Sequence, residues 1–293
     1  MHLNNVGSLW LRRYAVLVAF CTFALVIAGG LVTSNDAALS VPDWPLSWGH
    51  LVPTLEGGIR YEFAHRVAAM LVGLLTVGLA WGLRKNRLAG GCACPTACQR
   101  MAWAAVAVVL VQAALGGAAV RFVTPAWATI AHASLGQLFF AMMVAICVGL
   151  FAGFDGAHGP SLICAAALFA QSILGAGVRY GVVAPVAHIV GAVPATILVM
   201  WAGLSILMRQ MDNARVRRPA MVLLSIAFSQ VFLGIGALMA RVAYADAPQP
   251  MPMMVWFTVA HVAVGSLALG AAIALAMLAQ PHAFRVHGGV VTA

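Results

Sequence analysis

The chain has 293 residues, of which 63% are hydrophobic and only 8% are charged. A soluble globular domain carries about 25% charged residues, so this composition excludes a soluble protein and predicts an integral membrane protein. The formal net charge of +9 is a reason to consider nucleic-acid binding, but the positions of the basic residues argue against it.

Eight apolar segments reach the roughly 20 residues that a helix needs to span a bilayer. In chain order they lie at 14–33, 64–83, 101–120, 127–151, 161–178, 184–208, 220–240 and 253–279. The first follows Arg12 and Arg13 as in a signal peptide, but its apolar run is too long and no small-residue cleavage site follows it. We therefore expect eight retained transmembrane helices and an all-α fold.

The basic residues indicate which connections face the cytoplasm. With the N-terminus inside, eleven of the 16 Lys and Arg residues fall in inner segments. They are Arg12, Arg13, Arg84, Lys85, Arg87, Arg100, Arg209, Arg215, Arg217, Arg218 and Arg285. This bias is typical of cytoplasmic segments. It predicts a multi-pass protein of the inner (cytoplasmic) membrane, with both termini in the cytoplasm and no nucleic-acid partner.

Three of the six cysteines, Cys92, Cys94 and Cys98, cluster in the first inner connection. A site for a metal or for haem in transit is one interpretation, and reduced thiols in a cytosolic loop are the other. The spacing fits no standard zinc pattern, which favours reduced thiols. No cysteine falls in an outer segment, so no extracytoplasmic disulfide is expected.

A sequence repeat divides the chain into two halves. Gln112, Gln171 and Gln230 each begin a Gln-x-x-Leu-Gly motif and are spaced 59 residues apart, and 26–34 is a degenerate copy without the Gln. Each copy lies on an odd-numbered span that runs outward. This pattern predicts two four-helix bundles, 1–155 and 156–293, related by a pseudo-twofold axis along the membrane normal.

Four histidines lie near the outer ends of the four even-numbered spans. They are His65, His132, His188 and His261. Polar groups inside a membrane are costly and tend to mark function, and one histidine per hairpin at a similar depth is hard to explain by packing. The two halves pair them as His65 with His132 and His188 with His261.

Two facing imidazoles in a helical bundle are the ligand set of six-coordinate haem. Zinc or copper would need three or four close ligands, and each half offers two. A di-iron centre needs four carboxylates, and the chain has only two Glu residues, Glu56 and Glu62. The sequence therefore favours two bis-histidine haem sites.

Charged residues beside the histidines add to this interpretation. Four outer arginines, for which propionate binding and interfacial snorkelling are the alternatives, are Arg66, Arg121, Arg179 and Arg241. Glu62 lies one turn before His65, and no other histidine of the four has an acid nearby. Glu62 is either a proton-handling group or a local ion-pair partner of Arg66. The asymmetry suggests that one haem reacts and the other carries electrons.

Over essentially its full length, the chain resembles the haem A synthase family. The motifs that carry the resemblance are GGLVTS (29–34), PDWPLSWG (42–49), YEFAHR (61–66), AHASLGQLFF (131–140), AHIVGA (187–192) and AHVAVG (260–265). The resemblance implies an oxidoreductase that receives haem o in the N-terminal half and oxidises its C8 methyl to a formyl, giving the haem a of terminal oxidases. It also implies a haem b cofactor in the C-terminal half.

Carried over by motif, Glu62 would be the catalytic acid, His65 and His132 the ligands of haem o, and His188 and His261 the ligands of haem b. Haem o would be delivered by a haem O synthase. Many family members have a cysteine pair in the first outer loop, where this chain has Val41 and Ser47. A catalytic or electron-transfer role for that disulfide therefore does not apply here.

Two other classes of membrane haem protein remain open. A non-catalytic di-haem cytochrome b would use four histidines equally well, and a haem transporter or chaperone would use them as transient ligands. The lone Glu62 and the long polar segment 34–61 favour the enzyme. The electron acceptor, the order of the oxidation steps and the choice between a monomer and a homo-oligomer are open at this point.

Overall fold

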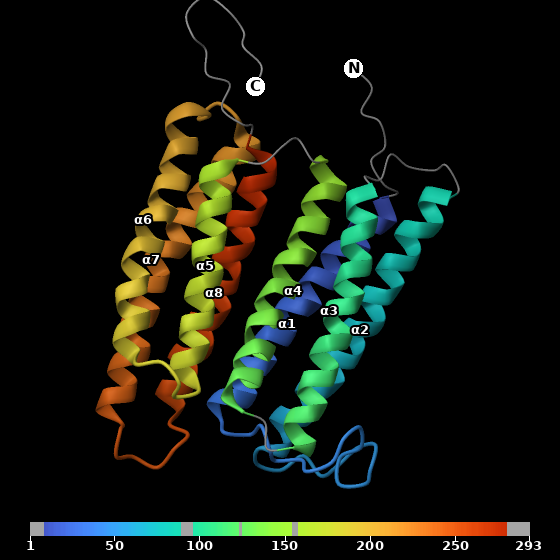
Figure 1. Ribbon diagram of the computed structural model, residues 1–293, viewed down its shortest axis with the longest axis vertical. Helices are drawn as coiled ribbons and strands as arrows, with labels where there is room; N and C mark the ends of the chain where they lie inside the picture. Colours follow the sequence, from blue (N-terminus) through green and yellow to red (C-terminus); the bar gives the residue numbers. More distant parts are fainter. Residues whose placement is uncertain (1–8, 89–95, 123–124, 154–157, 280–293) are drawn as a thin grey trace, which may run out of the picture.

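The computed structural model describes residues 9–88, 96–122, 125–153 and 158–279. Eight helices make up most of these residues (Figure 1). They are α1 (Leu9–Ser34), α2 (Ile59–Leu88), α3 (Thr96–Arg121), α4 (Ala126–Ala152), α5 (Gly159–Arg179), α6 (Pro185–Arg209), α7 (Ala214–Ala243) and α8 (Pro252–Leu278). Strand pairing within the described ranges is limited to one isolated bridge between Ser47 and His50.

All eight helices are long and apolar enough to cross a membrane, which confirms the all-α, multi-pass membrane fold. Their lengths run from 21 residues in α5 to 30 residues in α2 and α7. At 1.5 Å per residue, they equal or exceed the hydrocarbon thickness of about 30 Å. The helices therefore extend beyond several of the apolar segments that the sequence indicates.

The helices pack as two groups of four that lie side by side in Figure 1. In the first group, α1 contacts α2, α2 contacts α3, α3 contacts α4 and α4 closes the ring on α1; α5, α6, α7 and α8 form a second ring in the same order. The groups meet through α4 against α8, α1 against α8 and α4 against α5. A small residue permits the central contact, since a Cβ at Gly270 of α8 would lie 3.3 Å from Phe140 Cε1 of α4.

Each group has an apolar core at one end. The first core includes Val18, Leu79, Leu83 and Ile146, and the second includes Ile206, Val216, Leu223 and Leu275. These residues lie near the starts of odd-numbered helices and the ends of even-numbered ones. The opposite end, which holds the connections α1–α2, α3–α4, α5–α6 and α7–α8, is called the distal end below. It contains all four histidines of the predicted sites.

Candidate functional site

Each of the four histidines packs against a glycine of the preceding odd-numbered helix. A Cβ atom at these glycines would lie 3.2 Å from Cε1 of the ring for Gly29 and His65, 3.5 Å for Gly116 and His132, 3.1 Å for Gly175 and His188, and 3.2 Å for Gly234 and His261. A Cβ rarely comes closer than about 3.4 Å, so in three of the four hairpins any larger residue would push the ring away. The glycines therefore act as seats for the imidazoles.

A glutamine one turn before the glycine adds a hydrogen bond in three of the four hairpins. Its Nε2 donates to the backbone oxygen of the histidine. The donor–acceptor distances are 3.0 Å for Gln112 and His132, 2.6 Å for Gln171 and His188, and 2.7 Å for Gln230 and His261. In the first hairpin the same position is Leu25, which cannot donate. The sequence repeat therefore corresponds to a repeated contact between neighbouring helices.

The rings of His188 and His261 lie opposite one another at the distal end of the second group. Their centroids are 6.1 Å apart and their planes are at 86°. A metal binds an imidazole nitrogen at about 2.0–2.1 Å, and the ring centroid lies about 1.1 Å behind that nitrogen. Two imidazoles on opposite sides of one metal ion therefore have centroids about 6 Å apart. The observed separation fits an axial histidine pair.

The four imidazoles share a second property. The Nδ1 atoms of His65, His132, His188 and His261 are buried without a hydrogen-bond partner among the described residues. Buried polar groups are normally paired, so four equivalent unpaired atoms need an explanation. A metal bound at the other ring nitrogen does not supply a partner for Nδ1, so the metal interpretation rests on the ring spacing and not on these atoms. In the described part of the chain, no group of three or more His, Cys, Asp or Glu could hold a metal, so these sites offer two ligands each.

Glu62 is buried, with a relative exposure of 4%, and it is the one acidic residue in the buried set of the described chain. Its Oε1 forms an ion pair with Arg66 at 2.6 Å. Its Oε2 accepts a hydrogen bond from the backbone N–H of Val41 at 2.9 Å. Glu62 thus makes the local ion pair that is one of its two predicted roles, and it also anchors the first distal connection.

Arg66, on α2, also binds the connection between α1 and α2. Its Nη1 donates to the backbone oxygens of Asp43 and Leu46 at 2.7 and 3.0 Å, and its Nη2 donates to that of Val41 at 3.1 Å. Arginine carries five N–H donors, and those of Arg66 serve Glu62 and the loop backbone. Arg66 therefore fixes the course of residues 41–46.

The rest of this loop is held by Asp43. Its carboxylate accepts hydrogen bonds from the backbone N–H groups of Trp48 and Gly49 at 2.6 and 2.8 Å. The bond from Gly49, followed by that from Trp48, lowers the pKa of Asp43 below its ordinary value. Val41 and Ser47, at the positions of the family's cysteine pair, are both buried. In this chain, hydrogen bonds to Glu62 and from Arg66 connect that part of the loop to α2.

The other outer arginines have different surroundings. Arg179, at the end of α5, donates to the backbone oxygen of Thr33 and lies 3.5 Å from the carboxylate of Asp36, so it connects the second helix group to the first. Arg241 is exposed at the end of α7. Arg121 is exposed at the end of α3 and lines a pocket. The three side chains are not equivalent in their contacts.

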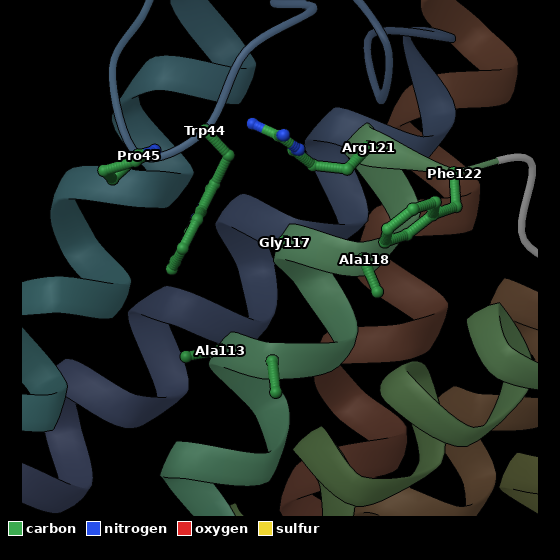
Figure 2. A pocket seen from close by; sticks show the side chains of 8 residues that line it. Trp44, Pro45, Ala113, Gly117, Ala118, Arg121 and Phe122 are labelled. Carbon is green, nitrogen blue, oxygen red and sulfur yellow. The ribbon is translucent and has the colours of Figure 1, made fainter.

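This pocket has a volume of about 380 Å³. Its wall is formed by small residues on one face of α3, by Arg121 and Phe122 and by the loop residues Trp44 and Pro45 (Figure 2). The indole of Trp44 rests on α3, since a Cβ at Gly117 would lie 3.1 Å from Trp44 Cδ2. The neighbouring Gly116 seats His132, but the lining of the pocket includes no histidine.

Sequence reasoning identified the histidines, Glu62 and the glutamine repeat, but it missed two contacts. It did not assign the glutamines to the histidine backbones, although the constant Gln-to-Gly spacing was a usable signal. It also missed Asp43 as the organiser of the distal loop. Of the predicted cysteine cluster, Cys98 is buried on α3, and Cys92 and Cys94 lie outside the described residues.

In the described part of the chain, the fold defines the class of protein: a multi-pass membrane protein of eight apolar helices that carries four partly buried histidines at its distal end. Residues 55–144 match the family model described as COX15-CtaA, cytochrome oxidase assembly protein. That range includes Glu62, Arg66 and the first histidine pair.

Curated relatives carry a more specific name. A protein named heme A synthase from Methylobacterium radiotolerans is 33% identical over 146 residues, which are 45% of this chain and 38% of that protein. Proteins of the same name from Halalkalibacterium halodurans and a Methylobacterium species are 37% identical over 75 residues and 29% identical over 149 residues. They cover 25% and 46% of this chain and 25% and 40% of those proteins. The matched part thus spans less than half of each relative. These matches confirm the resemblance to the haem A synthase family over the matched residues.

Proposed function

We propose that the protein is a haem A synthase, an oxidoreductase that converts the C8 methyl of haem o to a formyl group. The single observation that carries this proposal is the repeated histidine seat at the distal end, combined with the family match over the first pair. Each of the two helix groups offers one pair of imidazoles, and one pair has the spacing of axial haem ligands.

In this proposal, His188 and His261 bind a haem b that stays with the protein, and His65 and His132 bind the substrate haem o. The bound haem b would supply electron transfer, as haem iron does when its axial positions are filled. The chain would supply the histidine ligands, the glycines against which their rings pack, and surroundings with little water. The two units would be residues 1–155 and 156–293. If α1–α4 and α5–α8 swap places, each contact between two helices becomes another contact that is also observed. This supports a pseudo-twofold relation.

Glu62 is the proposed catalytic acid. It precedes His65 by three residues, so both lie on neighbouring positions of the same helical face. Arg66 and the backbone N–H of Val41 hold its carboxylate in one position. A charge fixed in this way can stabilise positive charge that develops beside it or receive a proton.

Location and partners follow from the same proposal. The positive-inside bias supports an inner-membrane protein with cytoplasmic termini, which would put the distal end on the outer side. Haem o would come from a haem O synthase through the lipid phase. Arg121 beside the first pair and Arg241 beside the second are the candidates for propionate binding, since Arg66 and Arg179 are engaged by the protein itself.

A non-catalytic di-haem cytochrome b is the second candidate function. The observation that favours it is the engagement of both Glu62 oxygens, which would make this acid purely structural. Haem extraction separates the two functions. The protein is expressed in a host that makes haem o but no haem a, and its extracted haems are resolved by chromatography and mass spectrometry. Haem a or its hydroxylated precursor supports the enzyme, whereas haem b alone in both sites overturns it.

A further inference from the structure

Three of the four histidines are held by a three-part contact. The odd-numbered helix contributes a glutamine and, one turn later, the glycine that seats the ring. The even-numbered helix contributes a second glycine, three or four residues after the histidine, that leaves room for the glutamine. A Cβ would lie 3.3 Å from Gln112 Nε2 if placed at Gly136, 2.7 Å from Gln171 Oε1 at Gly191, and 3.0 Å from Gln230 Nε2 at Gly265.

This contact fixes the histidine through its backbone. The amide group of one helix bonds to the carbonyl of the histidine on the next helix, so the two helices are tied at the level of the ring. The ring cannot tilt back because the glycine seat lies behind it. In a bilayer, where water does not compete, such a bond between helices resists both sliding and rotation.

The first hairpin keeps the seat but lacks the other two parts. Gly29 contacts the ring of His65, while Leu25 stands in place of the glutamine and Ala69 in place of the second glycine. The two differences match each other: Leu25 has no amide group that needs space, and the methyl group of Ala69 takes up the space that such an amide would need. His65 is therefore the one histidine of the four whose backbone is not tied to the preceding helix by a glutamine.

We propose that Gln112, Gln171 and Gln230 are positioning residues for three of the four histidines. Because Leu25 stands where the first hairpin would have this glutamine, His65 is the ligand that dissociates when the substrate haem exchanges for product. This inference rests on the proposed function. It explains how two similar sites treat haem differently: both ligands of the second pair are tied, so its haem is retained, whereas one ligand of the first pair is free to move away from the iron.

The test measures haem release from the purified full-length protein in detergent, with apomyoglobin as the acceptor. The variant L25Q/A69G builds the missing contact into the first hairpin, and L25M/A69G is its matched control without the amide. We expect L25Q/A69G to release haem from the first site about 2- to 10-fold more slowly than the control, the range of one net hydrogen bond. Equal rates in the two variants overturn the proposal.

The converse variants remove the contact where it exists. Q230L and Q171L should each speed release of haem from the second site by a similar factor. They should also change the ferric low-spin electron paramagnetic resonance g-values, which report the orientation of axial imidazole planes. Unchanged g-values together with unchanged release rates overturn the positioning role, even in a protein that folds normally.

A different result would count against the proposed function instead. If His188→Ala leaves the haem content and the spectrum of the wild-type protein unchanged, the histidines are not ligands and the proposed function fails. If His188→Ala removes haem while the glutamine variants behave as wild type, the ligand assignment stands and only the positioning role is lost.

Discussion

The distal ends of the two helix groups carry the same histidine seats under very different connections. In the first group, residues 35–58 form a long loop that is bound by Glu62 and Arg66 and held internally by Asp43. In the second group, the α5–α6 and α7–α8 connections are shorter, and the positions one turn before His188 and His261 hold no counterpart of Glu62. A buried acid, an anchored loop and one histidine without the glutamine contact occur together in the first group. In the proposed function, this group is built to admit and transform a ligand and the other to retain one.

The largest expected effect concerns the second histidine pair. His188→Ala or His261→Ala should remove the haem b of the proposed function, because a six-coordinate haem iron needs both ligands. The absorption spectrum of the purified protein measures this loss. His65→Ala is the matched control in the other group and should leave haem b in place while stopping product formation. A full bis-histidine spectrum in His261→Ala would contradict the assignment.

Glu62→Gln tests whether the acid of the first group is chemically active. The amide keeps the shape of the side chain but removes its charge, so haem a formation should fall to background. Haem b should stay bound, and haem o or a partly oxidised intermediate should accumulate in the extract. Haem a made at the wild-type rate would show instead that Glu62 serves only as the partner of Arg66 and Val41.

The anchored loop of the first group depends on Arg66. Arg66→Gln removes the ion pair with Glu62 and the bonds to three backbone oxygens, each charge-assisted bond contributing about 1.5–3 kcal/mol. Chymotrypsin should then cut after Trp48 at least about tenfold faster, because the loop opens more often. Arg241→Gln, which contacts no part of this loop, is the control. Equal cleavage of both variants would mean that the loop is held by other contacts.

Smaller effects are expected from the exposed arginines. Arg121→Gln should lower haem occupancy in the first group only, and Arg241→Gln should lower it in the second only, each by a few-fold at most. Arg179→Gln should leave both occupancies unchanged, since this side chain is engaged by Thr33 and Asp36. Haem-to-protein ratios of the purified variants provide the measurement. No change in any of the three would identify all of them as interfacial anchors.

The smallest effect at neutral pH concerns Asp43. Backbone hydrogen bonds, first from Gly49 and then from Trp48, lower its pKa from the ordinary 3.8. A carboxyl with a lowered folded pKa stabilises the fold above its ordinary pKa and loses that contribution as the pH falls through the folded value. The 41–50 loop should therefore resist pepsin down to about pH 3.8 and open only below it. Opening well above that pH would contradict this role.

The sequence by itself determined the eight helices, because spans of about 20 apolar residues have no other stable form in a bilayer. It also indicated the histidine layer, since one polar residue recurred at one position of each hairpin. The glutamine repeat was visible in the sequence, but its structural role was not. A pattern along one helix does not say which atom of the next helix it reaches.

The tertiary structure alone decided what the polar groups contact. Only the packing of neighbouring helices showed that the glutamines bind histidine backbones and that glycines seat the rings, because these contacts join residues 13 to 36 positions apart. The same holds for Arg66, which the sequence grouped with three other arginines. Its bonds run to a loop 20 to 25 residues earlier, and the course of an irregular loop is set by such distant partners rather than by a local period.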